Sequence, residues 1–221
     1  FHYNDIQSLK KQIKKYKNKI ACVILEPSST ECPKIDGKNS SLCCGKSKCD
    51  RNFKKEKHFL KEVELICKKN NIVFILDEMI TGFRWHLKGA QYFYGVKPDL
   101  STFGKAMANG FSVAAICGKK KIMELGSITN KEERVFLLST THGAEMNGLS
   151  AFVETIKILK KKKVIEHNWN YGEKLISETN KIAKKLKISE YFNLSGIACS
   201  PIFNCLDKEK KNSLEFRTLF I

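Results

Sequence analysis

Two features of the sequence could carry chemistry: a carboxylate at the end of an apolar run, and a lysine set among small residues. Asp77 closes the run "NIVFILD" over residues 71–77. A carboxylate that ends a buried strand is costly unless it meets a cation or several hydrogen-bond donors. Aspartate also caps loops and helices, so the position of Asp77 alone leaves both interpretations open.

The lysine is Lys105, which lies in "TFGKAMANG" over residues 102–110. Most lysines are surface charges, but these small and apolar flanks predict a partly desolvated amine, a candidate for a Schiff base. Asp77 and Lys105 together suggest pyridoxal 5'-phosphate as the cofactor. That molecule needs a lysine for its aldehyde and an aspartate to keep its pyridine nitrogen protonated.

The phosphate of such a cofactor needs hydrogen-bond donors as well. The stretch "STTHGAEMNG" over residues 139–148 supplies the hydroxyls of Thr140 and Thr141, and a helix is predicted to start just after them. The amide groups at a helix N-terminus favour an anion. Ordinary helix capping is the alternative role for these two threonines.

The elements that must position these residues form an α/β pattern. Continuous apolar runs over residues 20–27 and 71–78 end in acids, Glu26 in the first case, and an amphipathic helix is predicted between them over 54–70. Such strands are covered on both faces, which predicts a parallel sheet. Ligands bind beyond the carboxyl ends of the strands in sheets of this kind, where Glu26 and Asp77 would lie.

Further elements divide the chain into two domains. Helices are predicted over 5–19, 143–163 and onward to 187, with a strand over 112–118. We assign residues 1–163 to a large domain and 164–221 to the start of a smaller α+β domain, because residues 188–205 alternate like strands. The last residues, 215–221, also resemble a strand. Since the chain starts at Phe1 rather than Met, we expect it to be a piece of a longer protein.

Three stretches give the sequence a specific family resemblance. "VFILDEMITGFR", "PDLSTFGKAMANGFSVAAICG" and "STTHGAEMNGLSAF" resemble, in order and spacing, the signatures of class III (ω-type) pyridoxal-phosphate aminotransferases. The likeness is greatest to the branch that contains glutamate-1-semialdehyde 2,1-aminomutase. It implies a fold-type I enzyme with a three-layer α/β/α large domain, which transfers an amino group on a small amino or keto substrate. It also implies a homodimer with shared active sites.

The resemblance implies a role for each matching residue. Lys105 forms the Schiff base with the cofactor, Asp77 pairs with its pyridinium nitrogen, and the side chain of Met79 packs against its ring. Thr141 matches the threonine that binds the phosphate of the neighbouring subunit's cofactor, and Thr140 is its substitute. Neither aminotransferase nor aminomutase activity is favoured over the other, because both need the same residues.

Other positions match the family less closely. Glu26 would line the floor of the cofactor site or brace the region of Asp77, and Glu31 falls where some members carry a glutamate that guards the substrate pocket. Asn109-Gly110 replaces the two glycines that often follow the lysine. Asparagine tolerates the left-handed conformation, so the turn is expected to survive.

The sequence has nine cysteines, and several are isolated within apolar segments. This pattern is typical of reduced thiols in a cytoplasmic protein rather than of a disulfide framework. Four of the nine lie in the segment 30–53, a polar insertion, and these four suit either a zinc site or a loop of reduced thiols. The four are Cys32, Cys43, Cys44 and Cys49. His86 and His142 lack partners at metal-ligand spacing, so we expect structural or pocket-lining roles for them.

The formal charge of +17 invites comparison with nucleic-acid-binding proteins. The basic residues are mostly lysines scattered over helical faces, whereas nucleic-acid binders usually show clustered basic stripes, so we expect no nucleic-acid partner. No apolar run approaches the length of a membrane span, so no membrane partner is expected. Two alternatives to amino-group transfer are kept: an α/β enzyme that handles phosphate through Asp77, and a basic, non-enzymatic nucleic-acid-binding protein.

Overall fold

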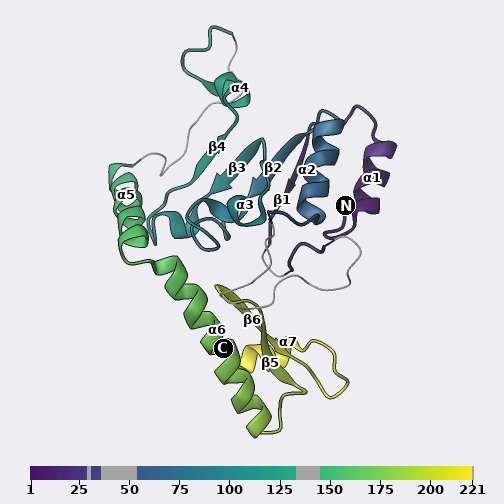
Figure 1. The fold of residues 1–221 in the computed structure, drawn as a ribbon, viewed down its shortest axis with the longest axis vertical. Helices are drawn as coiled ribbons and strands as arrows, with labels where there is room; N and C mark the ends of the chain where they lie inside the picture. Colours follow the sequence, from purple (N-terminus) through teal and green to yellow (C-terminus); the bar gives the residue numbers. More distant parts are fainter. Residues whose placement is uncertain (29–30, 36–53, 133–144, 221) are drawn as a thin grey trace. The chain divides into compact units, whose positions relative to one another are not determined.

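This computed structural model describes residues 1–28, 31–35, 54–132 and 145–220 of the chain. The chain separates into two compact units that divide between Lys163 and Val164. The first unit contains a four-stranded sheet with its helices, and the second contains a long helix with a two-stranded sheet (Figure 1).

The sheet of the first unit follows chain order, β1-β2-β3-β4. Its strands are β1 (Cys22–Leu25), β2 (Val73–Asp77), β3 (Leu100–Phe103) and β4 (Ala115–Gly118). The pairs β1–β2 and β2–β3 are parallel, as predicted, whereas β4 runs antiparallel to β3. The sheet is therefore mixed, not wholly parallel. The segment 104–114 between β3 and β4 is too short for the helical crossover that a parallel connection needs.

One face of the sheet packs against helices to form the core. Phe74 and Leu76 of β2 are fully buried, and helix α2 (Phe59–Lys69), whose Leu60 and Val63 are also fully buried, packs on this strand. Helix α1 (Ile6–Lys15) lies against α2. The amphipathic pattern of both helices therefore predicted their existence correctly, although each is shorter than its predicted range.

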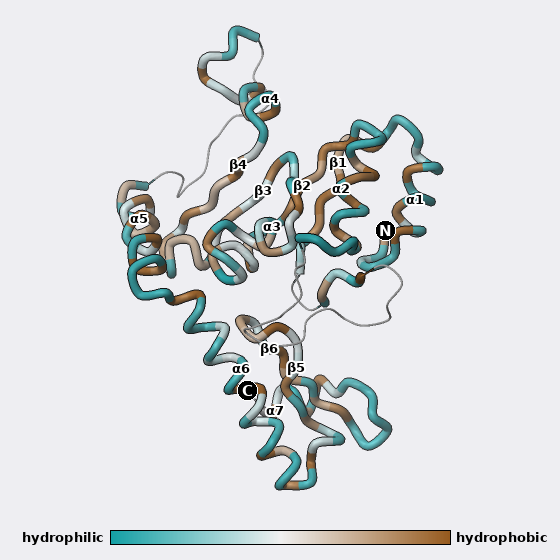
Figure 2. Tube along the Cα trace, viewed as in Figure 1, coloured by the Kyte–Doolittle hydropathy of each residue, from teal (hydrophilic) through white to brown (hydrophobic). Residues whose placement is uncertain are grey.

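Several short elements follow β2. These are α3 (Gly89–Tyr94), the 3-10 turn η1 (Lys105–Met107), α4 (Lys120–Met123) and the 3-10 turn η2 (Glu124–Gly126). The longer helix α5 (Met146–Lys161) packs on η1. Figure 2 shows hydrophobic stretches along β1 and β2, which agrees with the apolar runs of the sequence.

The second unit is built on α6 (Val164–Lys185), with strands β5 (Phe192–Ile197) and β6 (Ser200–Cys205) paired antiparallel. Its small core consists of Ala183, Phe192 and Cys205, with Leu194 and Phe203 packed against them.

The end of the described chain is the helix α7 (Leu214–Phe220), not the strand expected for residues 215–221. The hydroxyl oxygen of Ser213 accepts a hydrogen bond from the amide of Phe216 at 3.2 Å and so caps the helix. A serine at this position favours a helix, because its side chain satisfies an amide that the first turn leaves unpaired.

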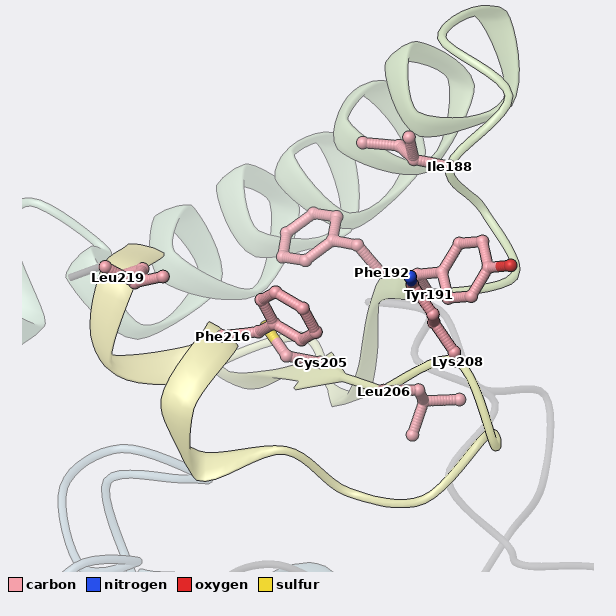
Figure 3. A pocket seen from close by; sticks show the side chains of 8 residues that line it. All are labelled: Ile188, Tyr191, Phe192, Cys205, Leu206, Lys208, Phe216 and Leu219. Atoms are coloured by element: carbon pink, nitrogen blue, oxygen red, sulfur yellow. The ribbon is translucent and has the colours of Figure 1, made fainter.

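A cavity of about 510 Å³ lies in the second unit, lined mostly by apolar and aromatic side chains such as Phe192, Phe216 and Leu219 (Figure 3). Lys208 is the only charged residue among those that line it. In the described part of the chain, no helix is both long enough and apolar enough to cross a membrane.

Candidate active site

Asp77 ends β2 at the carboxyl edge of the sheet, where it pairs in register with Thr102 of β3. Its Oδ1 accepts hydrogen bonds from the amide of Met79 at 3.0 Å and from the hydroxyl of Thr102 at 3.2 Å. No donor from the described residues reaches Oδ2. The side chain is half-buried, and the carboxylate is held at one oxygen while the other lacks a donor among the described residues.

Lys105 follows the neighbouring strand β3 at the same edge of the sheet. It lies three residues beyond Thr102, a backbone span of at most about 11 Å. Its φ angle is 45°, in the left-handed region, and it begins the turn η1, which the hydrogen bond from the amide of Met107 to the carbonyl of Gly104 closes at 2.9 Å. The fold therefore brings the predicted aspartate and lysine to adjacent strand ends.

The side chain of Lys105 is exposed, which differs from the partly desolvated amine expected from its flanks. The small neighbours that suggested burial, Gly104 and Ala106, are the physical reason, because they offer no bulk to cover the amine. An exposed amine at the edge of a sheet is accessible to a ligand that carries an aldehyde group.

Met79 connects the two residues. A Cβ atom at Gly104 would collide with the Cε atom of Met79 and lie 3.0 Å from its Sδ atom. The thioether therefore lies directly against the backbone that precedes Lys105. Met79 belongs to the loop after Asp77, so this loop contacts the turn that carries the lysine.

An aromatic cluster lies close to that turn, because Phe103 ends the strand that leads into it. The ring of Phe83 lies 5.6 Å from that of Phe103 and 5.9 Å from that of Phe152 on α5. A Cβ atom at Gly148 of α5 would also be 2.7 Å from Val113. The close contact of α5 with this region is thus part of what positions Lys105.

Glu78, next to Asp77, is a residue to which the sequence pattern assigned no role. It is fully buried, and its carboxylate accepts three hydrogen bonds within the protein. Burial raises the pKa of Glu78, and the hydrogen bonds from Gln91, Ala90 and Thr81 oppose that effect. The signal that could have identified Glu78 is the pair of adjacent acids, Asp77-Glu78. Successive side chains of an extended chain point to opposite sides, so the two carboxylates need different partners.

Glu26 follows β1 at the same edge of the sheet. Its Oε2 atom is buried and has no hydrogen-bond partner in the described part of the chain. Nearby, the hydroxyl of Tyr3 donates to the carbonyl of Pro27 at 2.7 Å, and burial raises the pKa of this tyrosine. A buried carboxylate oxygen left without a donor costs free energy.

Glu31 is exposed, and its Oε2 accepts a hydrogen bond from the side-chain amide of Asn4 at 3.2 Å. His86 stacks on Tyr92 with ring centroids 4.3 Å apart, and its Nδ1 accepts a hydrogen bond from the amide of Lys88 at 2.9 Å. These contacts give His86 a local packing role. Thr140, Thr141 and His142 lie outside the described residues.

The possible zinc site needs correction at Cys32. This residue is buried and disulfide-bonded, and a sulfur in a disulfide is not the thiolate that zinc requires. Its disulfide also differs from the reduced-thiol alternative. Cys43, Cys44 and Cys49 lie outside the described residues. Among the residues that the structure describes, no group of three or more histidine, cysteine or acidic side chains could hold a metal ion.

The arrangement fits the ring of pyridoxal 5'-phosphate. A carboxylate oxygen without a described donor suits its pyridinium nitrogen, an accessible amine suits its aldehyde, and the thioether of Met79 lies against Gly104, next to Lys105 in the chain. The hydroxyls expected to bind the phosphate, those of Thr140 and Thr141, belong to the part outside the described ranges.

Comparisons with known proteins agree with this geometry. The sequence model of the family described as aminotransferase class-III matches residues 52–202. Glutamate-1-semialdehyde 2,1-aminomutase from Wigglesworthia glossinidia brevipalpis is 33% identical over 208 residues, which are 94% of this chain and 43% of that protein. The 3-aminobutyryl-CoA aminotransferase from Cloacimonas acidaminovorans is 32% identical and is matched over 84% of this chain and 39% of its own length. The chain thus spans less than half the length of these relatives.

Solved structures confirm the predicted fold class. The FumI protein from Sphingopyxis sp. MTA144, solved in its PLP internal aldimine form, superposes with a TM-score of 0.71 at 20% identity, over 94% of this chain and 44% of that one. An omega-transaminase from Sphaerobacter thermophilus gives 0.69 at 21% identity, over 92% of this chain and 41% of its own. At these identities the likeness establishes the fold alone.

Proposed function

The chain belongs to the class-III aminotransferase family, and on this premise we propose that it carries the lysine and the aspartate of a pyridoxal 5'-phosphate site for amino-group transfer. The observation that carries the proposal is the pairing of Asp77 with Thr102, which brings the open carboxylate oxygen to the strand end just before Lys105. When bound, the cofactor supplies an electron sink for the pair left on the substrate carbon.

Asp77 would hold the cofactor through its pyridine nitrogen. The two hydrogen bonds to Oδ1 orient the carboxylate, and Oδ2 would accept from the protonated nitrogen. A carboxylate there keeps the nitrogen protonated, because an adjacent negative charge favours the charged form of its partner. Met79 would pack against the ring, in line with its contact to Gly104.

Lys105 would hold the cofactor covalently through Nζ at its aldehyde carbon. When not bound to the cofactor, Nζ would act as the base that takes a proton from the substrate carbon and as the acid that delivers it to the cofactor carbon. The exposed position of Lys105 at the start of η1 supports both tasks, since the amine is reachable and its backbone is fixed by the turn.

The remaining roles are assigned on resemblance. Thr141, with Thr140 as its substitute, would bind the phosphate of the neighbouring subunit's cofactor. Glu26 would line the floor of the site, which the buried, unpaired Oε2 supports. Glu31 would guard the substrate pocket from its exposed position.

The substrate is proposed to be a small molecule with an amino or keto group. The relatives include both aminomutases and an aminotransferase, so either reaction is consistent with the same residues. We also propose a cytoplasmic location, which the reduced thiols of Cys22, Cys67, Cys117 and Cys205 support, whereas the disulfide of Cys32 counts against it.

We also propose a homodimer, with residues 1–163 in the cofactor-binding large domain and 164–221 at the start of the small domain. An apolar stripe supports a partner surface on the large domain. Met146, Leu149 and Val153 recur at helical spacing on α5 and are 75%, 38% and 52% exposed. Helical stripes of this kind are usually covered.

The test is covalent labelling of the full-length protein. With pyridoxal 5'-phosphate added, we expect an absorbance band in the visible that sodium borohydride abolishes, and a reduced cofactor adduct on the peptide that contains Lys105. Lys105→Ala should lose the band and nearly all turnover. Lys97→Ala, which removes another exposed lysine of the same unit, is the matched control and should keep both. An adduct on any other lysine would refute the assignment.

A further inference from the structure

Glu78 is buried directly behind the candidate site, and its carboxylate clamps the start of α3. Its Oε2 accepts hydrogen bonds from the hydroxyl of Thr81 at 2.9 Å and from the amide of Ala90 at 2.6 Å. Its Oε1 accepts one from the amide of Gln91 at 2.8 Å. Among the described residues, three hydrogen-bond donors and no cation satisfy this fully buried acid.

The backbone of Glu78 makes two further connections. Its amide donates to the carbonyl of Thr102 on β3 at 3.0 Å, and its carbonyl accepts from the amide of Gly82 at 2.8 Å. The cradle around the carboxylate is closed at Gly89, where an added Cβ atom would lie 2.6 Å from Oε1 and the φ angle is 79°. This one residue therefore links β3, the loop after β2 and α3.

The residues on either side of this clamp belong to the proposed cofactor site. Asp77 precedes Glu78, and Met79 follows it. The amide of Met79 donates to the Asp77 carboxylate, and the Met79 thioether lies on Gly104 before Lys105. The relative positions of the Asp77 carboxylate, the Met79 thioether and Lys105 thus depend on where the backbone at residue 78 is held.

We propose that Glu78 is a positioning residue that keeps the Asp77 carboxylate and the Met79 side chain in register with Lys105. This inference rests on the proposed function. Glu78 itself does not touch the cofactor. It acts through its neighbours, because releasing the loop at residue 78 would move a donor to Asp77 and the thioether together.

The test is Glu78→Gln in the full-length protein. Glutamine keeps the shape and one acceptor oxygen, but its amide nitrogen would face backbone N–H groups that need an acceptor. We expect the dissociation constant for pyridoxal 5'-phosphate to rise about tenfold and kcat to fall about 10- to 100-fold, as for a misplacement on the order of 1 Å. The pH dependence of the visible cofactor band should also shift, since Asp77 is no longer held.

Two further variants separate positioning from stability. Gly89→Ala disturbs the clamp from its other side and should reproduce the cofactor effects, which keeps the test decisive if Glu78→Gln fails to fold. Leu9→Ala removes a buried side chain of α1 and should lower the melting temperature without changing cofactor affinity or the band. The inference is overturned if Leu9→Ala weakens cofactor binding as much as the clamp variants, or if those variants bind like the unaltered protein. A separate outcome, in which the unaltered protein binds no cofactor, would refute the proposed function and with it the inference that rests on it.

Discussion

The thioether of Met79 lies against the backbone of Gly104, so the loop after β2 and the turn that carries Lys105 touch where no side chain at position 104 would fit. The contact explains why a glycine must precede the lysine here. Glycine is required at position 104 for lack of steric space and not for its backbone angle, because any residue can adopt a φ of −176°.

Gly104→Ala should therefore disturb the site through Met79. Overpacking of this kind costs about 1–3 kcal/mol, and the displaced thioether should weaken the binding of pyridoxal 5'-phosphate. Thermal melting and cofactor titration of the full-length protein measure the two effects. The double variant Met79→Ala/Gly104→Ala removes the collision, so we expect it to be more stable than the two single changes predict when summed. Strict additivity would argue against the contact.

Asp77→Asn tests the charge of the carboxylate separately from its hydrogen bonds. The asparagine oxygen can still accept from Met79 and Thr102, so the variant should fold and melt close to the unaltered protein. Turnover should fall strongly, because a neutral amide cannot stabilise a protonated ring nitrogen. Near-normal turnover would support a capping role for Asp77 instead.

Thr102→Val tests the orientation of Asp77, because it removes the hydroxyl that donates to Oδ1 at 3.2 Å and keeps the side-chain shape. We expect a smaller loss of turnover than for Asp77→Asn, on the order of tenfold, as for a lost hydrogen bond to a charged group of about 1.5 kcal/mol. Thr102→Ser, which retains the donor, should be close to normal in steady-state kinetics. Equal losses in both variants would point to packing.

The pH dependence of stability should reveal Asp99. Its carboxylate accepts a hydrogen bond from the amide of Phe74 at 2.7 Å and pairs with Lys119 at 2.5 Å. Burial raises the pKa of Asp99, but the hydrogen bonds from Lys119 and Phe74 and the charge of Lys119 outweigh it, so the pKa lies below its ordinary value.

The folded state then binds fewer protons than the unfolded state, so Asp99 stabilises the fold at pH values above its ordinary pKa. This stabilisation is lost as the pH falls through the lowered pKa of the folded state. Asp99→Asn should therefore be less stable than the unaltered protein at pH 7, with the difference shrinking below about pH 4. Urea unfolding across this range measures it. Glu154→Gln, which breaks an exposed ion pair with Lys157, is the control and should change stability by less than about 0.5 kcal/mol at any pH.

Gly172 offers a test within the second unit. An alanine in a helix interior normally stabilises by up to about 1 kcal/mol relative to glycine. At Gly172 of α6, however, an added Cβ atom would collide with the carbonyl oxygen of Ala198 in the β5–β6 turn. Gly172→Ala should therefore lower the melting temperature. A stabilised variant would show that the helix and the hairpin are not in close contact.

Much of the candidate site could be predicted from local patterns. The apolar run before Asp77 predicted a buried strand that ends in an acid, and β2 ends at this residue. Amphipathic spacing predicted α1 and α2 within a few residues. These predictions succeed because burial imposes a period on the sequence wherever one face of an element is covered.

Other elements left no such pattern. Strand β3 is short and contains Ser101 and Thr102, so it exists through its pairing with β2 and β4 rather than through its own composition. The antiparallel direction of β4 follows from the length of its connection. Helix α3 also left no local signal, because the first amides of this helix are satisfied by the distant side chain of Glu78.

The sequence by itself thus determined which residues we propose for the chemistry, because Asp77, Lys105 and their neighbours form motifs within short stretches of chain. Only the tertiary structure decided how they are held: Thr102 at the Asp77 carboxylate, Met79 on Gly104, and Glu78 behind both. These contacts join positions 3 to 25 residues apart through hydrogen bonds and excluded volume. Such interactions depend on where strands and loops meet in space, and they impose no period on the sequence that could be recognised beforehand.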